Sequence, residues 1–260
     1  MIKITVLAEN TTANDGLKAE HGLSLYIETE RKKILFDMGQ TTLFAENAAK
    51  LGVDLASVDL AVLSHGHYDH GGGLARFLML NKTASVYLSR HAFGDYYNGT
   101  EKYIGLDKSL RDDRRLVFTD GVFEICEGLT LYSCNDAVKE FELGSFGLTE
   151  YKDGFFVPDP FLHEQYLLIE DEGRRILISG CSHKGVLNIV KWFTPDVLVG
   201  GFHFSKLPLD ETLKSYSKYL DSFGTEYYTC HCTGEEQYGF MKSYMSRLNY
   251  ISTGETIVCK

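Results

Sequence analysis

The feature that most constrains this chain is a short segment, residues 64–72, with the sequence Ser-His-Gly-His-Tyr-Asp-His-Gly-Gly. Four potential metal ligands fall within it: His65, His67, Asp69 and His70. Neutral imidazole and carboxylate groups suit zinc, manganese or iron. An apolar run, Leu60–Leu63, comes directly before the segment and predicts a buried strand, while the glycines allow a tight turn before a helix. This order favours a metal-binding loop over a histidine-rich surface loop, with His65 and His67 on one ion and Asp69 and His70 reaching a second.

The rest of the chain alternates between short apolar runs and segments whose apolar residues have helical spacing. Strands are expected at Ile2–Ala8, Leu23–Thr29, Lys33–Asp37, Leu60–Leu63, Arg175–Ser179, Asp196–Val199 and Glu226–Thr229. Helices are expected at Thr41–Leu51, Leu74–Leu80, Gly185–Phe193, Leu209–Leu220 and Gln237–Leu248. Two halves with this rhythm predict an α/β protein with a sheet-on-sheet core and helices outside, an αββα sandwich. We expect a single domain over residues 1–260, with an irregular middle insertion at about residues 90–161 that covers the site.

Side chains able to bind metal recur just past the ends of the predicted strands. They are Asp37, His65, His183, His203 and His231. In α/β proteins ligands gather beyond the carboxyl ends of the strands. This placement predicts that these residues belong to the functional site rather than to scattered surface positions.

Composition and charge restrict the partners of the chain. A net charge of −10 without a block of lysine and arginine argues against nucleic acid and leaves a small-molecule substrate as the expectation. No apolar run approaches the length of a membrane span, and the first residues lack the regions of a signal peptide. We therefore expect no membrane partner and a cytoplasmic location. The six cysteines do not resemble a disulfide framework, and a homodimer formed through the middle insertion stays open.

These motifs resemble those of the metallo-β-lactamase superfamily, and the resemblance covers essentially the whole chain. Asp37, in Phe-Asp-Met-Gly, resembles the first motif of that family, which orients the metal-binding loop. The H-x-H-x-D-H segment resembles the second motif. His231, in Cys-His-Cys-Thr-Gly, resembles the final histidine, a ligand of the second ion. The resemblance implies one or two divalent metal ions, with zinc favoured over manganese or iron.

The chain departs from the family pattern in its middle motifs. Cys181 stands where a metal-bridging aspartate is usual, so it could bridge two ions, bind one as a thiolate, or pack beside the site. His163 and His183 compete for the role of the third histidine. We favour His183 because it follows a predicted strand directly, and His163 stays open as a ligand or a structural residue.

A narrower resemblance rests on four short motifs taken together. They are Glu20-His21-Gly22-Leu23-Ser24, Gly180-Cys181-Ser182-His183, Gly200-Gly201-Phe202-His203 and His231-Cys232-Thr233-Gly234. The set resembles a subfamily of metal-dependent hydrolases. Some members are known as 7,8-dihydropterin-6-methyl-4-(β-D-ribofuranosyl)aminobenzene-5′-phosphate synthase, a condensing enzyme.

The resemblance implies an enzyme, a hydrolase that uses a metal-activated water on a small anionic, phosphate-containing substrate. In that case Asp69 holds metal and accepts a proton from the nucleophile, and His203 donates a hydrogen bond or proton to the substrate. Lys184 and Lys206 are the candidates to pair with a phosphate.

Two alternatives remain open at this point. In a synthase-like condensing enzyme, Tyr103, together with Tyr96 and Tyr97, would stack on the pterin ring of the substrate. In a di-iron redox protein the same loop would hold iron, although such domains usually keep a carboxylate where this chain has Cys181.

Overall fold

The computed structural model describes residues 1–259, and contacts within the chain divide it into two compact units. Unit 1 contains Met1–Asp120, Gly147–Gln165 and the C-terminal stretch that begins at Ser252. Unit 2 contains Gly121–Phe146 and Tyr166–Ile251. None of the helices formed by residues 1–259 is both long and apolar enough to cross a membrane. The expectation of one domain over the whole chain remains a prediction.

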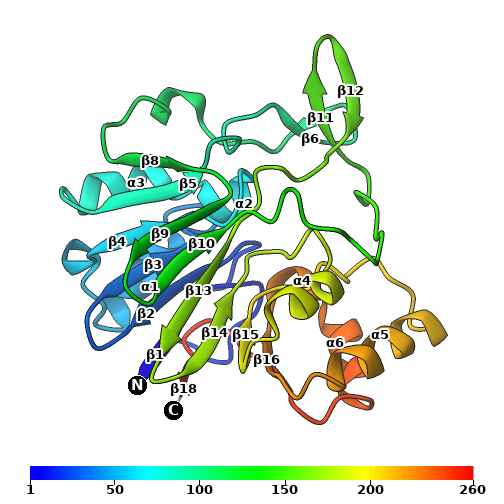
Figure 1. Cartoon of the computed structure of the whole chain (residues 1–260). Helices are drawn as coiled ribbons and strands as arrows, with labels where there is room; N and C mark the ends of the chain where they lie inside the picture. Colours follow the sequence, from blue (N-terminus) through cyan, green and yellow to red (C-terminus); the bar gives the residue numbers. More distant parts are fainter. Residues whose placement is uncertain (260) are drawn as a thin grey trace. The chain divides into compact units, whose positions relative to one another are not determined.

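The main sheet of unit 1 has seven strands, and its order places β1 beside β18, so the first and last strands of the chain are neighbours (Figure 1). From edge to edge the strands are β18 (Thr256–Cys259), β1 (Ile2–Ala8), β2 (Ser24–Glu28), β3 (Lys33–Phe36), β4 (Leu60–Val62), β5 (Ser85–Ser89) and β8 (Leu116–Thr119). Strands β3, β4, β5 and β8 are parallel. Their carboxyl ends therefore lie at one edge of the sheet, where α/β proteins place their sites.

Short helices cover this sheet through apolar side chains at helical spacing. They are α1 (Leu43–Lys50), η1 (Leu55–Ser57), α2 (Tyr68–Gly71), α3 (Leu74–Leu80) and η2 (Lys108–Leu110). Phe44 of α1 and Phe77 of α3 are fully buried in one cluster with Leu35 of β3 and Leu63, the residue after β4. Burying a phenylalanine completely contributes roughly 1.5–3 kcal/mol, so these contacts hold both helices next to the loop that follows β4.

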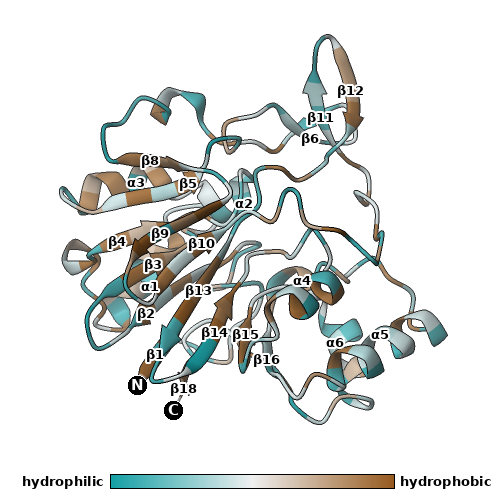
Figure 2. Cartoon of the chain, in the orientation of Figure 1, coloured by the Kyte–Doolittle hydropathy of each residue, from teal (hydrophilic) through white to brown (hydrophobic). Residues whose placement is uncertain are grey.

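Residues 90–161 are not irregular, as was expected, but contain several strands. Some of these strands form a small second sheet in unit 1. Residues 90–161 contain the strands β6 (Tyr96–Asn98), β7 (Lys102–Tyr103), β8, β9 (Val122–Cys126), β10 (Leu129–Tyr132), β11 (Leu148–Lys152) and β12 (Phe155–Pro158). The order of the small sheet is β12-β11-β6-β7. Asp153 and Gly154 both have positive φ, which closes the β11–β12 hairpin tightly, and β-forming aromatic residues flank that turn. Figure 2 shows the apolar run of β12, whose Phe155 is 72% exposed.

Unit 2 has its own seven-stranded mixed sheet with helices packed on it. The strands are, in order, β17 (Leu248–Tyr250), β16 (Glu226–Thr229), β15 (Val197–Val199), β14 (Arg174–Ile178), β13 (Tyr166–Asp171), β10 and β9. The helices are α4 (Val186–Phe193), α5 (Glu211–Asp221), η3 (His231–Thr233) and α6 (Glu235–Lys242). Strands β14 to β17 are parallel, so this unit too gathers strand ends at one edge.

The helix expected at Gln237–Leu248 is shorter than predicted. It ends at Lys242, and Leu248 instead begins β17, where it pairs with Tyr227 of β16. Leu248 and Met245 are nearly or fully buried in the core of unit 2. A buried apolar residue such as Leu248 fits a helical pattern and a strand pattern equally well. Its pairing with β16 is what makes it part of a strand.

Candidate metal centre

The metal-binding segment forms a tight loop between β4 and α2 in unit 1. His65 and Gly66 belong to the loop, and His67 precedes the first residue of α2. A Cβ added to Gly66 would overlap the carbonyl of Ala92, and one added to Gly72 would overlap the carbonyl of Gln40. The loop is pressed against neighbouring backbone on both sides, so its histidines are held in fixed positions.

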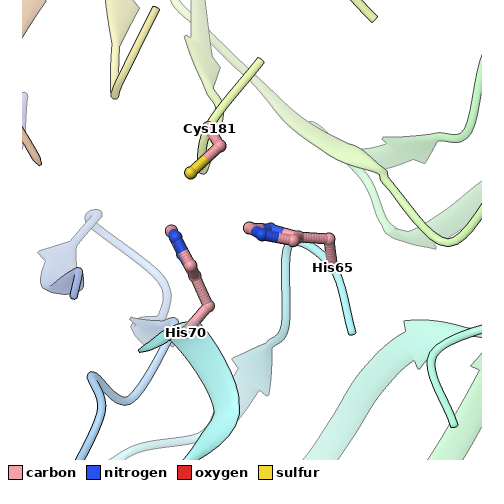
Figure 3. Close-up of side chains that lie close together, drawn as sticks. All are labelled: His65, His70 and Cys181. Atoms are coloured by element: carbon pink, nitrogen blue, oxygen red, sulfur yellow. The ribbon is translucent and has the colours of Figure 1, made fainter. Parts of the chain in front are cut away.

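The three histidines of the loop lie together and are buried. The ring centroids of His65 and His70 are 4.1 Å apart, and those of His65 and His67 are 4.6 Å apart. Figure 3 shows the imidazoles of His65 and His70 side by side. Three clustered imidazoles that are at most 3% exposed suit a transition metal better than a solvated surface loop.

Asp37 is in hydrogen-bond contact with Ser64 and His70 of this segment. Its Oδ1 accepts a hydrogen bond from the Ser64 amide at 2.7 Å, and its Oδ2 accepts one from the Ser64 hydroxyl at 2.7 Å. The same Oδ2 lies 2.6 Å from His70 Nδ1. A carboxylate at Nδ1 places the proton there and leaves Nε2 of His70 with a lone pair, the form a metal requires. Asp37 is fully buried and has a φ of 57°. Such a strained backbone conformation persists only where the surrounding structure enforces it.

His163 has both ring nitrogens engaged within unit 1. Nδ1 accepts a hydrogen bond from the Gly66 amide at 2.9 Å, so the ring proton is on Nε2, which lies 3.1 Å from Asp159 Oδ2. Burial alone would raise the pKa of Asp159, but the His163 and His67 imidazoles outweigh it and hold that pKa well below its usual range. This geometry supports His163 as a positioning residue for the loop, and His183 stays the preferred ligand of the two.

Asp69, the carboxylate of the segment, faces two imidazoles. Its Oδ2 lies 3.2 Å from His21 Nε2 and 3.9 Å from His70 Nε2. The Asp69 carbonyl accepts a hydrogen bond from the Leu23 amide, which ties the segment to the Glu20–Ser24 motif. His21 entered the sequence analysis only as part of that motif, and this contact places it beside a proposed ligand.

The candidate ligands of unit 2 follow three adjacent parallel strands. Cys181 and His183 follow β14, His203 follows β15, and His231 follows β16. Donor atoms of Cys181, His183 and His203 all lie within 4.8 Å of one another. The same holds for Cys181, His231 and Cys232. Sequence reasoning noted Cys232 beside His231 but gave it no role, and the adjacent strand ends are what bring it to Cys181.

Three residues that follow these strands have positive φ. Ser182, His203 and His231 have φ values of 58°, 57° and 51°, a region that side chains other than glycine rarely adopt. Nδ1 of His203 is buried and has no hydrogen-bond partner among the described residues. Burial would raise the pKa of the Cys232 thiol, but hydrogen bonds from Cys181 and His203 and the charge of His231 hold it well below its usual value.

The lysines and the tyrosine proposed to bind substrate are engaged with backbone carbonyls. Lys184 is buried and its Nζ donates to the Ser133 carbonyl at 2.7 Å, while Lys206 Nζ donates to the Phe146 carbonyl at 2.9 Å. The Tyr103 hydroxyl donates to the Leu106 carbonyl at 3.0 Å. These contacts give each residue a role inside its own unit.

Sequence reasoning missed Lys102, an exposed cation beside the metal-binding loop. Its Nζ donates to the Tyr68 hydroxyl at 3.0 Å and lies 5.0 Å from the centre of that ring. The hydrogen bond to Tyr68 raises the pKa of Lys102, with a smaller contribution from Asp69. Lys102 lies in β7 and pairs with Asn98 of β6, in a short hairpin that the sequence analysis did not predict.

Comparison with known proteins gives one consistent family. Residues 17–222 match the sequence model described as the metallo-beta-lactamase superfamily. An uncharacterised protein of Methanocaldococcus jannaschii is 32% identical over 244 residues, covering 90% of this chain and 91% of that protein. Another protein of this organism, named 7,8-dihydropterin-6-methyl-4-(beta-D-ribofuranosyl)-aminobenzene-5'-phosphate synthase, is 30% identical over 286 aligned positions, covering 98% of this chain and 96% of that protein.

Solved structures agree with the sequence matches. Tm1679, described as a metal-dependent hydrolase of the beta-lactamase superfamily, aligns with a TM-score of 0.86 at 29% identity over the full length of both chains. YhfI of Bacillus subtilis, a metallo-beta-lactamase fold protein, aligns with a TM-score of 0.62 at 14% identity over 99% of this chain, a likeness of fold alone. The α/β fold predicted from the sequence is confirmed.

Proposed function

Because this chain belongs to the metallo-β-lactamase superfamily, we propose that it is a metal-dependent hydrolase of a small anionic substrate. The observation that carries the proposal is the orientation of the loop: Asp37 accepts a hydrogen bond from Nδ1–H of His70, which leaves Nε2 free of a proton and able to bind a metal. A divalent ion, when bound, lowers the pKa of a water molecule toward neutrality and polarises the substrate oxygen. The donor set of imidazoles, a carboxylate and a thiol fits zinc first, with manganese or iron as alternatives.

Each of the two units contains proposed ligands. In unit 1 they are His65, His67, Asp69 and His70. In unit 2 they are His183 and His231, with Cys181 as a further donor. We propose that one or two ions bind, which the number of donors allows.

Two side chains are assigned to proton transfer. Asp69, 9% exposed, is the proposed acceptor of the proton that leaves the nucleophilic water. His203 is the proposed donor to the substrate, supported by its buried Nδ1, for which no described residue supplies a hydrogen bond. A small phosphate-containing molecule is the proposed substrate. Lys102 supports this as an exposed cation next to Tyr68, whereas Lys184 is buried and donates to the Ser133 carbonyl.

One observation favours a second candidate, a condensing enzyme. The methanogen protein named as a dihydropterin ribofuranosylaminobenzene phosphate synthase is 30% identical over nearly the full length of both chains. The small sheet of unit 1 offers aromatic side chains for a flat ring, with the rings of Tyr97 and Tyr103 5.3 Å apart. In that reaction a second substrate would take the place of water as the nucleophile, and diphosphate would leave from the first substrate as the new bond between the two forms.

The test starts from protein stripped of metal with a chelator and restored separately with zinc, manganese or ferrous iron. Turnover is measured on bis(p-nitrophenyl) phosphate, a lactone and a thioester. We expect metal-dependent turnover that disappears in His67→Ala and persists in His91→Ala, a histidine of unit 1 outside the metal-binding segment. Stoichiometric metal binding without turnover of any substrate would contradict a general hydrolase and favour the condensation.

A further inference from the structure

Three loops that leave adjacent parallel strands bring two sulfur atoms together in unit 2. Ile178 of β14 pairs with Val199 of β15, and Val199 pairs with Tyr228 of β16. The chain therefore leaves these strands at the same level. Cys181 follows the first strand and Cys232 follows the third, so the loop after β15 lies between the two cysteines in the strand order.

Two glycines permit this close approach. A Cβ added to Gly201 would overlap the sulfur of Cys232, and one added to Gly200 would overlap the carbonyl of Ser179. The Gly201 amide donates to the Gly180 carbonyl at 2.8 Å, which closes the β15 loop against the residue before Cys181. Any other residue at position 201 would push the β15 loop away from Cys232.

The resulting cluster is built from thiols and imidazoles. Cys232 donates a weak hydrogen bond to the Cys181 carbonyl at 3.5 Å, and the two residues are 7% and 3% exposed. The rings of His183 and His203 have centroids 4.4 Å apart. Cys181 belongs to both groups of donors that lie within 4.8 Å of one another, one with two histidines and one with His231 and Cys232.

His203 provides an independent sign that the cluster has a ligand. A buried polar atom without a partner costs roughly 1–3 kcal/mol. Nδ1 of His203 is such an atom among the described residues. The positive φ of His203 adds backbone strain, which persists where a functional geometry requires it. If the cysteines were buried only for packing, nothing would offset the cost of the unpaired Nδ1 of His203 or of its strained backbone.

We propose that Cys181, Cys232 and His203 are metal ligands, so that unit 2 binds its ion through two thiolates and at least one imidazole. This goes beyond the function proposed above, which gives Cys232 no part and uses His203 only as a proton donor. Each thiol releases its proton to the solvent as its sulfur binds the metal. Soft thiolate donors select zinc, cobalt or ferrous iron over manganese and magnesium.

The experiment uses the full chain stripped of metal and titrated with Co²⁺, whose bonds to thiolate absorb in the near ultraviolet. We expect this absorption in the wild-type protein, reduced to roughly half in Cys232→Ser and lost in the Cys181→Ser/Cys232→Ser double variant. Cys126→Ser, a half-buried cysteine of unit 2 at the end of β9, is the matched control and should keep the full absorption. His203→Ala should weaken Co²⁺ binding by about tenfold or more.

Absorption that is unchanged in Cys232→Ser would overturn the assignment of that thiol. A second measurement needs no variant: the zinc-loaded wild-type protein should show sulfur scatterers at about 2.3 Å in its X-ray absorption spectrum. A zinc shell of nitrogen and oxygen alone would reject the proposal even if the variants fail to fold. The Co²⁺ absorption and the X-ray absorption spectrum do not depend on turnover. A protein that binds metal through sulfur but turns over no substrate would therefore contradict the proposed hydrolase function and leave the proposed thiolate ligands intact.

Discussion

At the scale of single residues, the metal-binding loop depends on hydrogen bonds as much as on its ligands. Asp37 accepts from the amide and the hydroxyl of Ser64 and lies against Nδ1 of His70. His163 supports the loop from another side by accepting from the Gly66 amide. These two residues fix which ring nitrogens carry protons, and that choice decides which nitrogens can bind metal.

Replacing Asp37 with asparagine should weaken zinc binding by about 10–100-fold, because the amide cannot accept all the hydrogen bonds that the carboxylate accepts. Competition with a chromogenic chelator measures the affinity. Asp112→Asn, at an exposed position of the same unit, is the control and should bind zinc like the wild-type protein. Wild-type affinity in the Asp37 variant would show that the loop orients His70 without it.

Replacing Lys102 with methionine should raise the KM for bis(p-nitrophenyl) phosphate on the order of fivefold, because an exposed charge pair contributes up to about 1 kcal/mol. The KM for an uncharged lactone should not change, and Lys102→Arg should restore most of the loss. Lys82→Met, at an exposed position, serves as the control. An equal rise in KM for both substrates would mean that Lys102 shapes the loop through Tyr68 instead of attracting an anion.

At the scale of elements, two glycines of unit 2 should respond in opposite directions to alanine. Gly200 has a φ of 141° and its added Cβ would overlap a carbonyl, so Gly200→Ala should lower the free energy of unfolding by roughly 2 kcal/mol or more. Gly239 lies in α6, and a Cβ added to it would have no atom within 4 Å. Gly239→Ala should therefore raise the free energy of unfolding by about 0.5–1 kcal/mol. Urea unfolding measures both, and a neutral Gly200→Ala would mean that the strand end can move.

The junction between α3 and β8 should show a pH-dependent contribution to stability. Arg115 donates to the Leu78 carbonyl at 2.8 Å and to Asp113 at 2.8 Å. The hydrogen bonds from Arg115 lower the pKa of Asp113 in the folded state. The contribution of ionised Asp113 to the free energy of unfolding is therefore fully present above the unfolded-state pKa of about 3.9. It disappears as the pH falls through the lower pKa of the folded state.

Asp113→Asn should accordingly reduce the free energy of unfolding by about 1 kcal/mol at pH 7, and this difference should shrink toward zero as the medium becomes strongly acidic. Denaturant titrations of the variant and the wild-type protein across this pH range provide the measurement. A difference independent of pH would assign the effect to the shape of the side chain instead of its charge.

Elements with strong local signals were predicted correctly, and elements set by sheet partners were not. Strand β1 and helix α3 have the predicted bounds, because their apolar residues follow a single period. The strands of residues 90–161 were missed. Three of their pairings, β5–β8, β6–β11 and β10–β13, join residues far apart in the sequence, so no local pattern predicts them. The hairpins β6–β7, β9–β10 and β11–β12 are local and carry turn glycines with positive φ, a signal that the sequence analysis did not use.

At the scale of the whole molecule, the net charge of −10 governs which large partners the chain can bind. Because the sequence has no block of lysine and arginine, we expect that the chain does not neutralise a row of phosphates. A fluorescent 20-nucleotide single strand should therefore show no change in anisotropy with up to about 10 µM protein at physiological salt. Saturable binding below that concentration would contradict the proposal that the partner is a small molecule.

The sequence by itself determined the family, the metal-binding segment and the strand-end positions of most candidate ligands. These are local properties: four candidate ligands in six residues, and short apolar runs that are followed within a few residues by a histidine. Only the tertiary structure decided that His163 has both nitrogens engaged, that Lys184 is occupied and that Cys232 joins Cys181. Those facts depend on the register of paired strands and on contacts between residues far apart in the chain, and no local pattern encodes such contacts.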